Sequence, residues 1–167
     1  MRVRAGSRGS TPWIQPEHAS WVPEGWVAPW PADRFDASVF SEIAPLVQER
    51  VAMLSEIPPM IDFLFLEDAP TDPDASAKVI TNDPRAPEIL RAAIDAYETA
   101  PFDAASLHEV TLAMGDAMDL KLRKTQAPIR VAVTGRSVGP PLFESLSLLG
   151  RDEVRRRLGV ALDRATG

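Results

Sequence analysis

The side chains of this chain that could do chemistry are few, and their spacing argues against catalysis. The 167 residues include no cysteine and only two histidines, His18 and His108. Neither histidine has a second histidine or a carboxylate at the spacing of a metal site, and His108 beside Glu109 is typical of a surface helix. Thr134 and Ser137 have no nearby base, which a hydroxyl nucleophile requires. We therefore expect no catalytic residue, no metal and no cofactor in this chain.

One glycine-rich stretch, residues 134–141 (TGRSVGPP), invites comparison with a phosphate-binding loop. It fails that comparison because no strand precedes it, no lysine follows its second glycine, and proline stands where a helix should donate amides. We interpret it as a corner between two helices. Arg130 and Arg136 flank its start, and arginine suits phosphates or the exposed base edges of a single-stranded RNA loop. Leu142 has two open interpretations, contact with an unstacked base or burial in the core.

Charge is distributed unevenly along the sequence. The chain carries −6 overall, yet residues 35–120 hold 4 basic and 17 acidic residues, whereas residues 121–167 hold 10 basic and 4 acidic residues. A basic end on an acidic body is typical of a protein that meets RNA with one face. An arginine-rich last helix that only decorates a folded protein gives the same pattern, so both interpretations stay open.

Residues 1–34 are expected to form an irregular arm. They hold five of the 16 prolines and show no helical or strand period. They also hold all four tryptophans, whose indoles either lie on a neighbouring bundle or await a partner: Trp13, Trp21, Trp26 and Trp30. Stacking of these rings on RNA bases is the third alternative.

Residues 35–68 change to a helical period. Apolar residues recur at three- and four-residue spacing from Val39 to Leu54. Pro45 predicts a kink or a helix start near Ala44. Pro58-Pro59 are expected to break the chain, and residues 60–66 (MIDFLFL) are expected to form a buried helix.

Residues 69–167 carry clear signals for the ends of helices. Asp83 is expected to cap a helix with Pro84 at its first position, Asp103 to cap the next, and Pro140 to open another. Gly150 is placed as a helix C-cap, with Asp152 and Glu153 in the first turn of the last helix. The sequence shows no sustained strand pattern and no apolar run long enough for a membrane span. We therefore predict an all-α helical bundle, whose length allows one domain or two small lobes. The absence of cysteine fits the reducing cytoplasm.

From Gln126 onward the sequence holds an ordered set of residues: Gln126, Pro128, Arg130, Thr134-Gly135, Pro140, Leu142-Phe143-Glu144 and Leu149-Gly150. In the types and spacing of these residues the segment resembles the C-terminal anticodon-binding region of bacterial glutamyl-tRNA synthetases. Residues 45–68 are similar to the preceding anticodon-binding lobe, more loosely. The resemblance implies the all-helical anticodon-binding fold of class I synthetases, with a partial first lobe over 35–68 and a C-terminal lobe over 69–167.

The resemblance also implies a partner, a glutamate tRNA, and a set of residues that meet it. Carried over by position, the anticodon-reading candidates are Arg50, Arg130, Gly139 and Leu142. Candidate phosphate contacts are Arg123, Lys124 and Arg136. Gly139 departs from the serine or threonine that many members carry, so only backbone contacts are expected there. No contact with DNA or with a membrane is expected.

The family's catalytic domain carries a HIGH-like and a KMSKS-like motif, and neither occurs in these residues. We therefore expect a tRNA-binding module that cannot aminoacylate alone; ATP and magnesium would belong to the catalytic domain, and a separate synthetase catalytic portion is an expected partner. The alternative is a degenerate helical domain that serves protein interaction or regulation and no longer binds tRNA.

Overall fold

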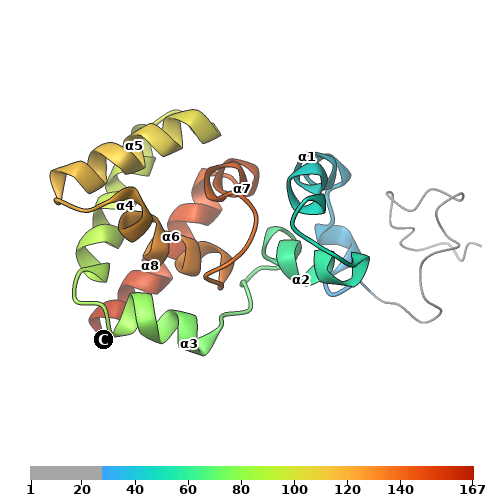
Figure 1. Cartoon of the computed structure of the whole chain (residues 1–167), viewed down its shortest axis with the longest axis horizontal. Coiled ribbons are helices and arrows are strands. Elements are labelled where there is room, and N and C mark those ends of the chain that lie inside the picture. Colours follow the sequence, from blue (N-terminus) through green and yellow to red (C-terminus); the bar gives the residue numbers. More distant parts are fainter. Residues whose placement is uncertain (1–27) are drawn as a thin grey trace, which may run out of the picture.

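The computed structural model describes residues 28–167, apart from the side chain of Leu54, and there the chain forms helices and no strand (Figure 1). The all-helical prediction is confirmed for this part of the chain. The expectations for Trp13, Trp21 and Trp26 lie outside the described residues. No helix in the described part is both long and apolar enough to cross a membrane.

The N-terminal lobe, residues 28–68, is built from short helices. In chain order they are η2 (Ala32–Arg34), α1 (Ala37–Gln48), η3 (Leu54–Glu56), α2 (Ile57–Ile61) and η4 (Asp62–Leu64). Figure 1 shows these elements grouped beside the larger set of helices that follows. The side chain of Asp36 caps α1 by accepting the backbone N–H groups of Ser38 and Val39.

For this lobe, the predicted helix start near Ala44 and the predicted break at Pro58-Pro59 are wrong, whereas a kink at Pro45 stays a prediction. Helix α1 starts at Ala37, not near Ala44, and contains Pro45 in its last turn, where the helix is about to end. Pro58 and Pro59 do not break the chain; they lie in the first turn of α2, where a missing N–H has no helical partner to lose. The expected single helix over 60–66 is instead the end of α2 followed by the 3₁₀ turn η4.

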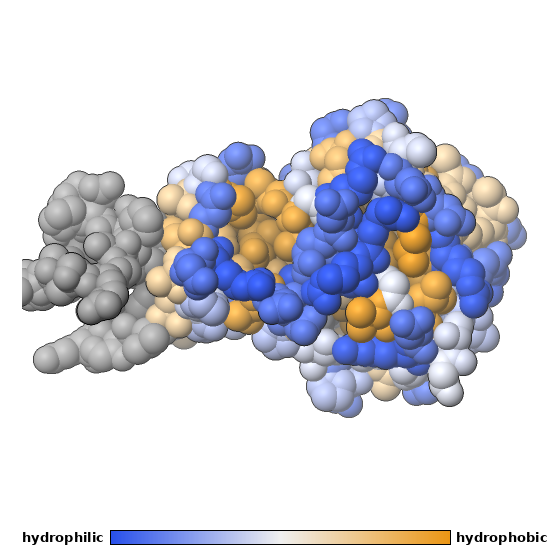
Figure 2. All heavy atoms as spheres, turned by 180° about the vertical axis from the view of Figure 1, so that it is seen from behind, coloured by the Kyte–Doolittle hydropathy of each residue, from blue (hydrophilic) through white to orange (hydrophobic). Residues whose placement is uncertain are grey.

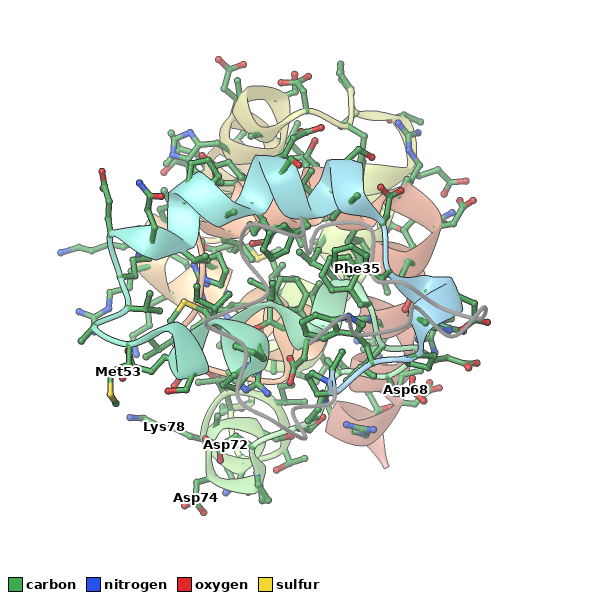
Figure 3. The ribbon with its side chains drawn as sticks, turned by 90° about the vertical axis from the view of Figure 1, so that its right-hand side faces the viewer. Phe35, Met53, Asp68, Asp72, Asp74 and Lys78 are labelled. Atoms are coloured by element: carbon green, nitrogen blue, oxygen red, sulfur yellow. The ribbon has the colours of Figure 1, made fainter. Side chains whose placement is uncertain are left out.

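The core of the N-terminal lobe is aromatic. Trp30, Ile43, Val47, Ile61 and Phe65 are buried together, and the ring centroids of Trp30 and Phe65 lie 5.0 Å apart. Phe35 lies beneath α1 against the same rings (Figure 3). For Trp30, the alternative of an indole that lies on a neighbouring helical bundle is therefore the one observed.

The C-terminal lobe, residues 69–167, has longer helices. They are α3 (Pro73–Ser76), the π-helical turn η5 (Ala77–Thr81), α4 (Ala86–Thr99), α5 (Ala104–Ala117), α6 (Leu122–Thr134), α7 (Leu142–Leu149) and α8 (Arg151–Thr166). Residues from α4 to α8 fill its core, among them Tyr97, Leu107, Ile129, Leu146 and Leu158, all fully buried. Leu148 of α7 packs against the core of the N-terminal lobe, so the two lobes share an apolar contact.

Most predicted helix ends are confirmed. The carboxylate of Asp103 accepts the N–H of Ser106 at the start of α5, and Gly150 ends α7 with a φ of +88°. Asp152 and Glu153 lie in the first turn of α8. The prediction for Asp83-Pro84 is wrong by two residues: Asp83 accepts the N–H of Arg85, and the helix begins only at Ala86. Similarly, α7 begins at Leu142 rather than at Pro140.

Tyr97, the only tyrosine of the chain, gives a direct probe of the core. Its side chain is fully buried, with its hydroxyl 2.6 Å from Thr111 Oγ1. Burial raises the pKa of Tyr97 to about 12, and the hydrogen bond with Thr111 opposes this in part. Because the folded pKa lies above the unfolded one, the stability linked to Tyr97 is fully present below the unfolded pKa and is lost as the pH rises through the folded pKa.

We therefore predict that tyrosinate absorbance of the folded chain rises with a midpoint near pH 12 rather than near the ordinary value of about 10. The free energy of unfolding, measured with urea, should fall as the pH rises from the ordinary tyrosine pKa of about 10 to about 12. Tyrosinate formation near the ordinary value, with an unchanged helical circular dichroism spectrum, would contradict the burial of this hydroxyl.

Gly135, which ends α6, occupies a position that no other residue fits. Its φ is +74°, and an added Cβ would lie 2.2 Å from the carbonyl oxygen of Pro70. Gly135→Ala should therefore lower the free energy of unfolding by at least about 2 kcal/mol. Gly159→Ala is the matched control, because no atom lies within 4 Å of its added Cβ and alanine favours the helix by about 0.5–1 kcal/mol. Equal urea midpoints for the two variants would contradict the described turn.

Candidate nucleic-acid interface

The predicted corner at 134–141 is held in place at both ends. Thr134 Oγ1 donates to the carbonyl of Arg130 at 2.9 Å and, in turn, accepts the N–H of Arg136. The carbonyl of Gly135 accepts the N–H of Asp72 at 2.8 Å. At the other end, Arg130 Nη1 donates to the carbonyl of Pro140 at 2.8 Å. The corner is thus closed by a side chain of the helix that precedes it, and Thr134 serves as a capping hydroxyl.

Two of the four predicted anticodon-reading positions, Arg130 and Gly139, are neighbours at this corner, and the charge of a third, Arg50, acts on Arg130. An added Cβ at Gly139 would lie 3.8 Å from Arg130 Nη1, so the glycine and the guanidinium are neighbours. Burial, and after it the positive charge of Arg50, lowers the pKa of Arg130. Arg50 follows α1 in the N-terminal lobe, so the two arginines bring positive charge to one place from two lobes.

Neither Arg50 nor Arg130 forms an ion pair with any residue of the described chain. Two unpaired like charges close together repel each other, and a bound anion between them removes that cost. The arrangement suits a phosphate or an electron-rich base edge. Because arginine stays charged at every physiological pH, this property does not depend on a titration.

Leu142 is the fourth predicted position, and its side chain is only 3% exposed. It belongs to the core of the C-terminal lobe at the first residue of α7. Of the two interpretations of Leu142, burial in the core is the one that the structure shows. The exposed apolar residue at this corner is Val138, 78% exposed and next to Gly139. The sequence could have indicated the exposure of Val138, because it is a single apolar residue inside a turn that contains glycine and serine.

Arg136, predicted to contact phosphate, is engaged within the chain. Its Nη1 lies 2.8 Å from Asp62 Oδ1 and its Nη2 lies 2.7 Å from Asp62 Oδ2, and Nη1 also donates to the carbonyl of Pro59. Asp62 is 5% exposed, in η4 of the N-terminal lobe. The hydrogen bonds to this carboxylate raise the pKa of Arg136. Sequence reasoning did not single out Asp62, although a lone acid inside an apolar run was a visible signal.

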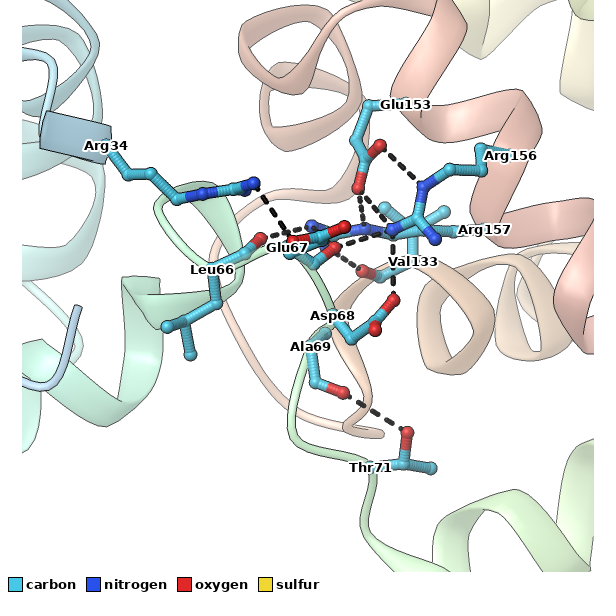
Figure 4. A network of polar contacts seen from close by, with 10 residues as sticks. All are labelled: Arg34, Leu66, Glu67, Asp68, Ala69, Thr71, Val133, Glu153, Arg156 and Arg157. Carbon is cyan, nitrogen blue, oxygen red and sulfur yellow. Dashed lines mark hydrogen bonds and ion pairs between the residues drawn. The ribbon is translucent and has the colours of Figure 1, made fainter. Parts of the chain in front are cut away.

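Arginines of α8 are also engaged within the chain (Figure 4). Arg157, 5% exposed, donates to the carbonyls of Val133 at 2.8 Å and Leu66 at 2.9 Å and to Glu153 Oε1 at 2.7 Å. Arg156 pairs with Asp68 and Glu153. Figure 4 shows both guanidinium groups against residues 66–68, the end of the N-terminal lobe and the segment that joins it to the C-terminal lobe.

The other end of α8 is held in the same way. Arg151 donates to the carbonyls of Glu98 and Ala100 at the end of α4, and Arg155 pairs with the Glu98 carboxylate at 3.1 Å. The arginine-rich last helix therefore binds the protein to itself. Of the two interpretations of the basic C-terminal end, this favours an arginine-rich helix that belongs to the folded protein over one that meets RNA.

A group of exposed cations lies at the start of α6, close along the helix to Arg130. Lys121, Arg123 and Lys124 are exposed, and none has an ion pair with a described residue. Arg123 precedes Arg130 by seven residues, so both lie on one face of α6, about 10 Å apart along its axis. Positive charge at a helix N-terminus is opposed by the helix dipole, so these side chains gain nothing from their own helix.

Two hollows in the described residues differ in size, and the larger, beside Asp116, Asp119, Leu120 and Lys121, is open to solvent and measures about 280 Å³. The cavity bounded by residues 68–71, Ile80, α6 and α8 measures about 30 Å³, room for water only. No three His, Asp or Glu side chains between residues 28 and 167 gather as a metal site would require. On the face in Figure 2, hydrophilic residues cover the junction of the lobes, with apolar surface in separate areas on either side. The unpaired arginines and lysines described above can bind anions.

Comparison with known proteins agrees with this geometry. The model of the anticodon binding domain family matches residues 14–162. Glutamate–tRNA ligase of Frankia casuarinae is 51% identical over 140 residues, which are 84% of this chain and 29% of that protein. The ligase of Streptomyces griseus is 42% identical over 167 residues, 99% of this chain and 31% of that protein.

A solved structure shares the fold. The glutamate tRNA ligase of Elizabethkingia meningosepticum superposes with a TM-score of 0.69 at 22% identity, over 77% of this chain and 25% of that one. The chain therefore spans less than a third of the length of these relatives. Since the family model covers nearly the whole sequence, the chain belongs to the anticodon binding domain family.

Proposed function

We propose that this chain binds tRNA and reads the anticodon stem-loop of a glutamate tRNA. The observation that supports this most strongly is the meeting of Arg50 and Arg130, unpaired and from different lobes, beside the open turn at Gly139. The names of the relatives, all glutamate–tRNA ligases, supply the nature of the RNA. Residues 35–68 and 69–167 are proposed as the two lobes that hold the anticodon between them.

Each predicted residue has a proposed part. Arg50 and Arg130 contact phosphates or base edges, and Gly139 leaves its backbone open to a base. Leu142 supports the first turn of α7 from the core side. Arg123 and Lys124 contact the phosphate backbone farther along α6.

Aminoacylation is no part of what these residues do alone. In the proposed arrangement a separate synthetase catalytic portion activates glutamate with ATP and magnesium, and this chain holds the tRNA for it in the cytoplasm. A helical domain devoted to protein interaction is the competing function. It predicts no selective RNA binding, so the RNA titrations below separate the two.

Removal of either central arginine should weaken tRNA binding. Arg50→Ala and Arg130→Ala each remove a charge-assisted hydrogen bond to RNA, and we expect a Kd about tenfold higher for each, since every tenfold change corresponds to about 1.4 kcal/mol. Fluorescence anisotropy with labelled glutamate tRNA measures this. Arg91→Ala is the matched control, because Arg91 is exposed on α4 and has no ion pair with a described residue. Equal affinity of all four proteins would mean that the site is elsewhere.

Arg123 and Lys124 should act through charge alone. The double variant Arg123→Ala/Lys124→Ala is expected to weaken binding equally for tRNAs with different anticodons. It should also reduce the slope of log Kd against log salt by about 1.5, because each phosphate that a cation neutralises contributes roughly 0.7–0.9 to that slope. A salt slope that matches the unmodified protein would show that these side chains do not touch phosphate.

A further inference from the structure

A buried ion pair connects the halves of the proposed site. Asp62 belongs to the N-terminal lobe and Arg136 to the corner of the C-terminal lobe, 74 positions apart, and two parallel hydrogen bonds of 2.7 and 2.8 Å join them. Asp62 lies between Ile61 and Phe63, both fully buried. A carboxylate in such surroundings needs its partner, because an unpaired buried charge is costly.

The pair of Asp62 and Arg136 links the part of the chain that carries Arg50 to the corner next to Arg130. On one side, α2 and η4 follow the segment that carries Arg50, and α2 packs with α1. On the other, Arg136 directly follows Gly135 and is hydrogen-bonded to Thr134, whose hydroxyl reaches back to the Arg130 carbonyl. Its second acceptor is the carbonyl of Pro59, also in the N-terminal lobe. Any rotation of one lobe against the other must break this geometry first.

Other contacts between the lobes lie away from the corner or lack direction. Leu148 supplies apolar contact, which resists separation but permits sliding. Arg156 and Asp68 form an ion pair with side chains 41% and 81% exposed, and exposed pairs contribute little. Arg157 donates to the carbonyls of Leu66 and Glu67, at the very end of the N-terminal lobe and not in its core. The fork between Asp62 and Arg136 is the contact that fixes an angle.

From these observations, and resting on the proposed function, we infer that Asp62 and Arg136 are positioning residues that hold Arg50 in register with Arg130 and Gly139. Arg136 thus serves RNA binding through Asp62 and Arg50 rather than by touching phosphate. When the fork is broken, the lobes stay folded and attached, Arg130 still meets the RNA, and Arg50 no longer contributes to binding.

The first test measures whether Asp62 and Arg50 act together. The Kd for glutamate tRNA is measured for the unmodified chain, Asp62→Asn, Arg50→Ala, Arg130→Ala and the double variants Asp62→Asn/Arg50→Ala and Asp62→Asn/Arg130→Ala. We expect Asp62→Asn to weaken binding about as much as Arg50→Ala, roughly tenfold. Adding Arg50→Ala to Asp62→Asn should change little, whereas adding Arg130→Ala should multiply the effect. Multiplied effects of Asp62→Asn and Arg50→Ala, or unchanged affinity of Asp62→Asn, would overturn the inference.

The second test does not use RNA. Because the chain has no cysteine, a spin label can be placed on each lobe through Ser41→Cys in α1 and Glu109→Cys in α5, both exposed. Pulsed electron spin resonance then gives the distribution of distances between the lobes. We expect one narrow distribution for the unmodified chain and a broader one for Asp62→Asn. Arg136→Lys keeps the charge but cannot form the fork, so it should broaden the distribution as well and replaces Asp62→Asn if that variant does not fold.

Glu67→Gln is the matched control for both tests, since it removes one exposed carboxylate of the Arg34 pair. It should leave the distance distribution and the Kd unchanged. Narrow distributions in both Asp62→Asn and Arg136→Lys would overturn the inference. If Arg50→Ala and Arg130→Ala have no effect on RNA binding, the proposed function fails instead, and the distance measurement still decides whether the pair fixes the lobes.

Discussion

The structure depends on one buried guanidinium, that of Arg157. The last carbonyls of a helix have no partner within it. Arg157 supplies one for Val133 near the end of α6 and uses its other nitrogens for Leu66 and Glu153. Burial lowers the pKa of Arg157, yet the group stays charged as arginine does, so it needs every one of these acceptors. Arg157 therefore links the end of α6 to residues 66–67, where Arg156 also binds Glu67 and Asp68, and the corner at 134–141 directly follows the end of α6.

Arginine has two separate uses in this chain, and only tertiary structure tells them apart. Arg136 and four arginines of α8, Arg151, Arg155, Arg156 and Arg157, are engaged with carbonyls and carboxylates of the protein itself. Arg50, Arg123 and Arg130 have no ion pair with a described residue, and Arg50 and Arg130 lie close enough to repel each other. The net charge of the C-terminal segment therefore overstates how much of it is available to RNA. What counts is the unpaired cations near the corner, which lie on α6 and just after α1.

Local signals in the sequence were sufficient for much of the fold. The caps at Asp103 and Gly150 and the all-helical class follow from neighbouring residues, and they are confirmed. Prolines led to wrong predictions where position within a helix mattered: Pro58-Pro59 begin α2 instead of interrupting the chain, and α4 starts beyond Pro84. The link between Asp62 and Arg136 spans 74 positions and depends on how two lobes meet, so no local pattern could predict it. The sequence also left two surroundings open for Leu142, an unstacked base or the core, and only the packing of α7 shows that the side chain is buried in the core.

The proposed function requires that two arginines from two lobes form one anticodon-reading site. A titration of the chain with three RNAs tests this at low and moderate salt: glutamate tRNA, the same tRNA with a substituted anticodon, and an unrelated tRNA. We predict a selective fall in affinity when the anticodon alone is changed, and the selectivity should persist at moderate salt because base contacts do not depend on counterion release. Equal affinity for all three RNAs, or no binding to any, would contradict a shared site of Arg50 and Arg130.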